Sequence, residues 1–131
     1  MSETLSALTN QQLAEKFAAI SAQQGEAVRV EDTKKYNKLF DALQRVVNEL
    51  RARGTDARKV LIPLLDAPTP EANWNYQTSQ TRFNAAVELK ALAPERAQAT
   101  LEALASKGLR QFRGMAGMSL YYDEMGISKP T

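Results

Sequence analysis

The 131-residue sequence contains neither cysteine nor histidine. Without them it has no disulfide, no thiolate or imidazole ligand for zinc, and no histidine-based catalytic triad. No D-x-D-x-D-G run that would form a calcium loop occurs. The adjacent carboxylates of Glu31-Asp32 and Asp123-Glu124 project about 100° apart on a helix and do not share a proton. These absences predict a protein that is not an enzyme and holds no metal and no cofactor, although an activity based on a concave cluster of Asp or Glu stays formally open.

Long apolar runs and strong charge are also missing. The longest apolar run, VLIPLL at 60–65, is far shorter than the roughly 20 residues that span a bilayer. The start, MSETLSALTNQQ, has neither the basic nor the apolar region of a signal peptide. The net charge is +2, from 17 basic and 15 acidic residues, so no strong electrostatic field is expected. We therefore expect a cytoplasmic protein without membrane contact.

Strand signals are scarce, because β-branched residues nowhere alternate with polar ones over a useful length. Apolar residues instead recur at intervals of three and four residues, the spacing of helices. The predicted fold class is all-α, with about six helices. We expect a first helix that stops at Gly25, a second capped by Asp32 or Thr33 and closed by Gly54, a third kinked at Pro63, one across 83–92, one from Pro94 to Lys107, and a last from about Leu109 to Met125.

A short frame, R-x-x-A-[A/G]-x-x-L, occurs twice. It starts at Arg82 and again at Arg113, 31 residues later. A period in the 30s with paired helices is typical of α-solenoids, although a chance match between two Ala/Gly-rich helices stays open. We interpret the glycines of GMAG at 114–117 as sites of close helix packing. We interpret the two arginines as structural ties, with Asp66 as a partner of either.

Four stretches carry a family resemblance: YNKLFDALQRVVNELRARG, VLIPLLDAP, RFNAAVELKALAPERAQATLEAL and AGMSLYYDEMG. Through them, residues 36–126 resemble a bacterial family of uncharacterised small proteins, a domain of unknown function with a HEAT-like α–α superhelix. The resemblance implies a short right-handed stack of HEAT/ARM-like helical repeats, with the first helix as N-terminal cap and no established activity.

The chain departs from that pattern after its third helix. HEAT-like repeats usually pass from the Asp-Pro turn to the next helix's arginine in about five residues, whereas Pro68 to Arg82 takes fourteen. We therefore expect one domain over 1–131 with an inserted connector at 66–78. Residues 1–10 and 127–131 are tails whose order the sequence leaves open.

The connector holds the only tryptophan, Trp74, among polar residues. Either a helix starts at Thr69-Pro70 and Trp74 packs beneath it, which also permits one long helix from 70 to 92, or the connector is exposed and presents aromatic side chains to a partner. Tyr121 and Tyr122 are adjacent, so at least one should be partly exposed. The candidate partner-binding residues are Asn73, Trp74, Asn75, Tyr76, Tyr121 and Tyr122. They predict a non-enzymatic module that binds another protein or forms a homodimer; an immunity-type inhibitor of a toxin is a narrower version by analogy.

Nucleic-acid binding is the alternative, and we expect it less. Basic residues gather near the turns at Gly54 and Gly108, and they would form one patch if both turns lay at the same end of the stack. The candidates are Arg51, Arg53, Arg58, Lys59, Lys107 and Arg110. Against this, Glu49 and Asp56 interrupt the first group, and basic residues at helix C-termini are what the helix dipole selects.

Overall fold

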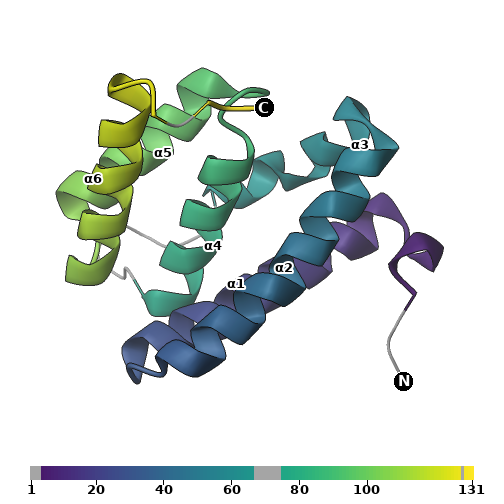
Figure 1. The fold of residues 1–131 in the computed structure, drawn as a ribbon, viewed down its shortest axis with the longest axis horizontal. Coiled ribbons are helices and arrows are strands. Elements are labelled where there is room, and N and C mark those ends of the chain that lie inside the picture. Colours follow the sequence, from purple (N-terminus) through teal and green to yellow (C-terminus); the bar gives the residue numbers. More distant parts are fainter. Residues whose placement is uncertain (1–3, 67–74, 128) are drawn as a thin grey trace.

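The computed structural model describes residues 4–66, 75–127 and 129–131. Within these residues every regular element is helical (Figure 1). The elements are η1 (Leu5–Ala7), α1 (Asn10–Arg29), α2 (Thr33–Arg53), α3 (Thr55–Arg58), η2 (Lys59–Asp66), α4 (Tyr76–Glu88), α5 (Pro94–Lys107) and α6 (Arg110–Glu124), where η marks a 3-10 helix. The predicted all-α fold class is confirmed. None of the described helices is long and apolar enough to cross a membrane.

Local sequence signals account for most helix ends. The side chains of Thr9 and Asp32 accept hydrogen bonds from backbone N–H groups at the starts of α1 and α2. Gly54 closes α2 with a φ of 102°, a left-handed conformation that favours glycine. Pro94 begins α5. Pro63 lies within η2, and the predicted third helix is accordingly a four-residue α-turn that continues as a 3-10 helix.

The prediction that the first helix stops at Gly25 is wrong. Helix α1 continues through Gly25 to Arg29, and Gly25 itself is buried. A Cβ atom at this position would lie 2.2 Å from the carbonyl oxygen of Tyr76 at the start of α4. The glycine therefore allows α1 and α4 to approach closely, and it is not a termination signal.

The core lies between two helical hairpins and the helix between them. Helices α1 and α2 form one hairpin, α5 and α6 form another, and α4 packs against α1 on one side and α5 on the other (Figure 1). Helix α1 therefore contacts both α2 and α4 and is not a peripheral N-terminal cap. The largest fully buried apolar side chains are Phe17, Phe112, Leu13, Leu50, Leu61, Leu89, Leu101 and Leu104.

The predicted connector at 66–78 is described only at its ends. Asp66 ends η2, and Asn75 stands before α4 in an extended conformation with φ −129° and ψ 167°. One unbroken helix from 70 to 92 is therefore wrong. The N-terminal tail contains η1, whose Leu5 carbonyl accepts a hydrogen bond from Arg53. At the other end, Thr131 is held by hydrogen bonds from two arginines.

Candidate protein-binding surface

Two of the predicted partner-binding residues have structural roles. The Asn75 side chain caps α4 by accepting hydrogen bonds from the Thr78 backbone N–H at 2.8 Å and from its hydroxyl at 2.9 Å. The Tyr76 ring packs edge-on against the buried Phe112 ring, with centroids 6.1 Å apart. Asn73 and Trp74 lie outside the described residues.

The other two predicted residues are at the surface. Tyr121 is 51% exposed and Tyr122 39% exposed, and their rings contact each other at 6.0 Å between centroids. The prediction that at least one of them is partly exposed is confirmed. Both lie in the last turns of α6, beside other exposed apolar residues.

These tyrosines belong to a larger apolar surface between α4 and α6. A groove of about 520 Å³ runs between the two helices. It is lined by Phe83, Val87, Lys90, Gly114, Met115, Met118, Ser119 and Tyr122. We call this groove, together with the exposed side of α6 that carries Tyr121 and Met125, the α4–α6 surface.

A polar tie fixes one end of the groove. The Lys90 ammonium, in the turn that follows α4, donates to the Ser119 hydroxyl at 2.6 Å and to the Asp123 carboxylate at 2.9 Å, both on α6. The Lys90 side chain is only 10% exposed, so the pair is shielded from solvent screening. The tie sets the position of α6 relative to α4, and the apolar side chains beside it are held on a rigid frame.

The GMAG glycines do not have the role predicted from the sequence. Ala116 is fully buried, as close helix packing requires. A Cβ atom added at Gly114 or Gly117, however, would meet nothing within 4 Å. Each glycine costs a helix interior about 1 kcal/mol relative to alanine, and among the described residues no packing contact offsets that cost. The glycines instead leave open space above the backbone of α6 on the α4–α6 surface.

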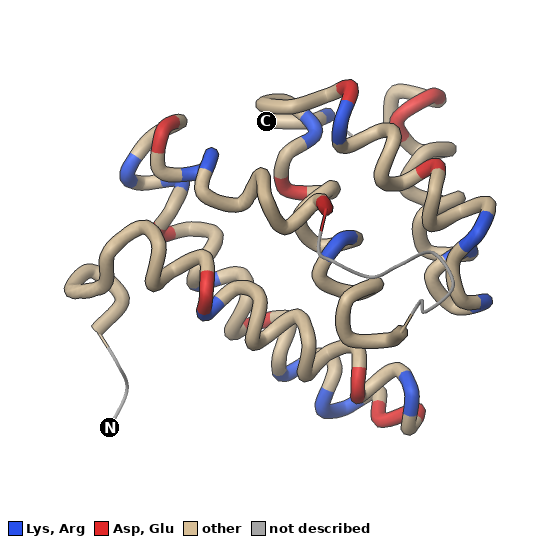
Figure 2. The backbone as a smooth tube through the Cα atoms, turned by 180° about the vertical axis from the view of Figure 1, so that it is seen from behind, with Lys and Arg blue, Asp and Glu red and all other residues tan. Residues whose placement is uncertain are grey.

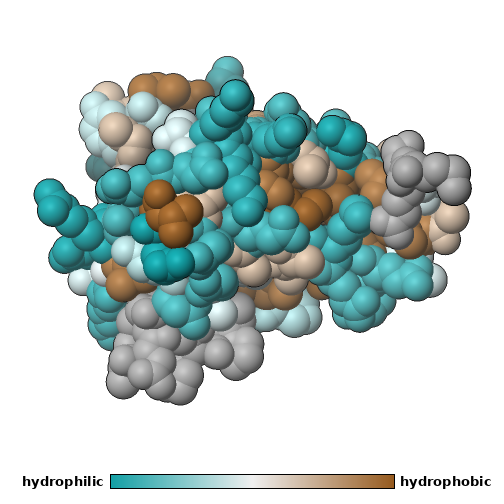
Figure 3. All heavy atoms as spheres, turned by 90° about the horizontal axis from the view of Figure 1, so that it is seen from below, coloured by the Kyte–Doolittle hydropathy of each residue, from teal (hydrophilic) through white to brown (hydrophobic). Residues whose placement is uncertain are grey.

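Exposed apolar side chains also occur on the first hairpin. The face shown in Figure 3 carries an apolar band near its middle, bordered by hydrophilic residues. Phe40 on α2 is 51% exposed, the same fraction as Met118 on α6. Phe40 is therefore a matched reference for the α4–α6 surface, because it offers similar exposure without the groove.

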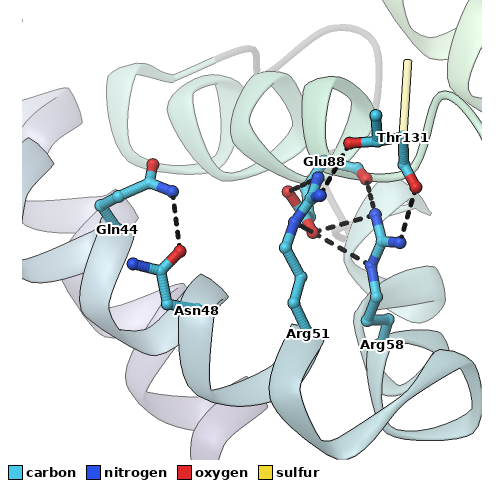
Figure 4. Close-up of polar contacts among 6 residues, drawn as sticks. All are labelled: Gln44, Asn48, Arg51, Arg58, Glu88 and Thr131. Carbon is cyan, nitrogen blue, oxygen red and sulfur yellow. Dashed lines mark hydrogen bonds and ion pairs between the residues drawn. The ribbon is translucent and has the colours of Figure 1, made fainter.

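The basic residues near Gly54 are largely engaged within the protein. Arg51 makes a two-pronged contact with the Glu88 carboxylate at 2.9 and 3.0 Å, and Arg58 contacts the same group at 3.2 Å. Arg58 also donates to the backbone oxygens of Glu88 and Thr131, each at 2.9 Å, while Arg51 donates to the Thr131 hydroxyl at 2.7 Å (Figure 4). This cluster ties α2 and α3 to α4 and to the last residue.

The remaining predicted nucleic-acid residues do not form one patch. Arg53 pairs with Glu49 at 3.0 Å, and Lys59 lies 3.5 Å from Asp56. The Gly54 turn, between α2 and α3, and the Gly108 turn, between α5 and α6, lie at opposite ends of the molecule (Figures 1 and 2). Lys107 and Arg110 are therefore distant from the first group.

Asp66 pairs with Arg96 of α5. The sequence had suggested Arg82 or Arg113 as its partner. Arg82, Asp66 and Arg96 all line one hollow of about 320 Å³, whereas Arg113 is exposed on α6. The tie between neighbouring helices was expected, but it uses the arginine of the following helix.

A buried polar cluster between α1, α2 and α4 was missed. The Asn84 amide donates to Ser21 Oγ at 2.9 Å and to Gln24 Oε1 at 2.8 Å, and Gln80 donates to the Tyr36 hydroxyl at 3.1 Å and to Asn84 Oδ1 at 2.9 Å. Burial raises the pKa of the Tyr36 hydroxyl. Ser21 and Gln24 lie on the same face of α1 as Leu13, Phe17 and Ile20. Their helical spacing from these apolar residues could have indicated that they are buried. Because Gln24 and Gln80 are fully buried, the cluster fixes the register of α1 against α4 and does not face a partner.

Comparisons with known proteins agree with this all-helical arrangement. A family model described as "Domain of unknown function (DUF2019)" matches residues 11–123. The crystal structure of the protein RPA1889 from Rhodopseudomonas palustris CGA009 is similar to the chain, with a TM-score of 0.85 and 31% sequence identity. The match covers 99% of this chain and 100% of that one. No curated protein matches. The chain therefore belongs to the DUF2019 family, and its resemblance to a family of uncharacterised proteins is confirmed at that level.

Proposed function

We propose that this protein is a non-enzymatic module that binds another protein through the α4–α6 surface. The observation that carries the proposal is the gathering of half-exposed apolar residues around one groove: Val87, Met118, Tyr121, Tyr122 and Met125. Contiguous exposed apolar patches on monomeric proteins often mark interaction sites. Tyrosine and methionine are also enriched in protein interfaces.

The residue types of the chain support a binding role. The chain has no histidine or cysteine, and among its described residues no three acidic side chains gather where a metal ion could bind. Among the ion pairs of the described residues, Glu88 has the most buried carboxylate. This carboxylate pairs with Arg51 and Arg58, and the Glu88 backbone oxygen also accepts a hydrogen bond from Arg58. Such a group stabilises helix contacts and is not available as an acid or base.

We further propose a HEAT-like arrangement of three successive helical pairs, in a bacterial cytoplasmic protein. The pairs are α1–α2, η2–α4 and α5–α6, and each packs against the next. Stacked helical pairs of this kind commonly present one side to a protein partner. An immunity-type inhibitor would be one example, by analogy.

Nucleic-acid binding is less well supported than protein binding. Arg51, Arg53 and Arg58 each contact an acidic side chain of the same chain, so they are partly neutralised. The two basic turns lie at opposite ends of the molecule (Figure 2). Binding to nucleic acid would fall steeply with salt, whereas binding through an apolar surface is nearly insensitive to it.

The test is affinity capture from a lysate of the source organism with three folded proteins. They are the wild type, a Val87→Lys/Met118→Lys variant, and a Phe40→Lys control. We expect a protein retained by the wild type and by the control at 0.5 M salt, and lost from the double variant. Equal recovery by all three proteins, or recovery of nucleic acid alone that salt releases, would overturn the proposal.

A further inference from the structure

We propose that the partner of the α4–α6 surface is a second copy of this chain, docked so that the two α6 helices lie antiparallel. The inference rests on the proposed function and names its partner. It is argued from the distribution of charge, glycine and exposed apolar residues along α6.

The charges of α6 are placed against its own dipole. Arg110 and Arg113 stand in the first turns, and Glu124 is the last residue of the helix. All three are exposed, and within the described residues none of them makes an ion pair. A helix N-terminus favours acidic groups and a C-terminus favours basic ones. The reversed placement is therefore unfavourable for α6 alone.

An antiparallel partner helix removes that conflict. It places the basic start of one α6 beside the acidic end of the other, and it sets the two helix dipoles in opposite directions. A two-fold axis makes the contact self-complementary, because Arg110 of each copy meets Glu124 of the other. A parallel pairing would instead bring like charges together.

The glycines fall where such a pairing needs small residues. Residue 117 is the midpoint between 110 and 124, so Gly117 of one copy would face Gly117 of the other. Neither Gly117 nor Gly114 has a neighbour within 4 Å of an added Cβ, so both leave room for the partner backbone. With this register, Tyr121 lies opposite residues 113–114. Its half-exposed ring can then cover Gly114 of the second copy.

The size of this contact sets the expected affinity. One helix pair with flanking side chains buries less than the roughly 800 Å² per partner of a standard stable interface. We therefore expect a weak dimer, with a dissociation constant on the order of 10 µM. Its formation should depend on concentration and only weakly on salt, because the apolar contacts persist at high salt and the Arg110–Glu124 contacts are at the rim.

Sedimentation velocity of the full chain tests the inference between about 1 and 300 µM at low salt. We expect the sedimentation coefficient to rise from the monomer to the dimer value across this range. Arg110→Glu alone and Glu124→Arg alone should each weaken association by about tenfold or more, whereas an equimolar mixture of the two variants should restore a dimer. The weakening in each single variant is specific to antiparallel pairing, because parallel copies would already place like charges together in the wild type.

Gly117→Gln provides a second measurement that does not depend on charge. The substitution should raise thermal stability, because glutamine is a better helix former than glycine and meets open space, yet it should abolish dimerisation. A wild type that stays monomeric at 300 µM would overturn the second-copy inference and leave the lysate capture to decide the proposed function. A dimer that the mixture fails to restore, or that Gly117→Gln leaves intact, would overturn the antiparallel α6 contact.

Discussion

Replacing Gly25 with alanine should lower the stability of the protein, whereas replacing Gly114 with alanine should raise it. Both are interior helical glycines, one in α1 and one in α6. A Cβ atom at position 25 would lie 2.2 Å from the Tyr76 carbonyl oxygen and 2.6 Å from its carbonyl carbon. These are backbone atoms, so no side chain can rotate away and α4 itself must shift. A Cβ atom at position 114 meets nothing within 4 Å.

The magnitudes follow from two opposing contributions. Alanine gains about 1 kcal/mol over glycine in a helix interior, and an overpacked core site costs about 1–3 kcal/mol, occasionally more. Because the clash at Gly25 involves backbone, we take the upper end and expect Gly25→Ala to lose about 2 kcal/mol net. Gly114→Ala should gain about 0.5–1 kcal/mol, since only the helix propensity acts there.

Urea unfolding followed by far-UV circular dichroism at about 5 µM measures both variants below the concentration at which a dimer is expected. The two midpoints should shift in opposite directions from the wild type, with unchanged m-values. Equal shifts of the same sign would refute the close approach of α1 and α4 at Gly25. A loss of stability in Gly114→Ala would refute the assignment of that position to open surface.

Three further predictions concern the polar contacts. Glu88→Ala leaves the Arg58 side chain, 8% exposed, without its carboxylate partner, and should lower the unfolding free energy by about 3 kcal/mol. Arg51→Ala removes a side chain that is 36% exposed and should cost less than about 1 kcal/mol in the same urea assay. Equal losses in the two variants would contradict this account. Asn75→Ala removes the cap of α4 and should lower the unfolding free energy by about 1 kcal/mol, with Asn75→Ser restoring most of it. Burial raises the Tyr36 pKa above its ordinary value, so the folded state favours the neutral phenol; its contribution is fully present below about pH 10 and is lost as pH rises through the folded pKa. Tyr36→Phe should therefore lose less stability than the wild type as the pH rises above about 10, and parallel pH profiles would show that this group does not contribute.

The helices were predictable because their signals are local. Thr9, Asp32 and Pro94 act on backbone groups within one turn, and such effects are the same in any fold. Pro63 likewise predicted a distorted third helix, because its missing donor and fixed ring act at its own position.

The candidate site depended on contacts that the sequence does not display. Gly25 resembles a helix stop until α4 is placed against it, and Gly114 resembles a packing residue until its surroundings are seen to be open. Asn75 and Tyr76 look like recognition residues, yet Asn75 caps α4 and Tyr76 packs on Phe112. Polar residues of the same composition can cap a helix or meet a partner, and only tertiary structure separates these roles.

The most direct test of the central claim is a hydroxyl-radical footprint of the α4–α6 surface, because methionine and tyrosine side chains oxidise readily. The footprint would compare the dilute chain alone with the chain in the complex that it forms. The account predicts a several-fold lower oxidation rate at Met118, Tyr121 and Tyr122 in the complex, with Phe40 unchanged. Protection at Phe40 with none at these three residues would contradict it.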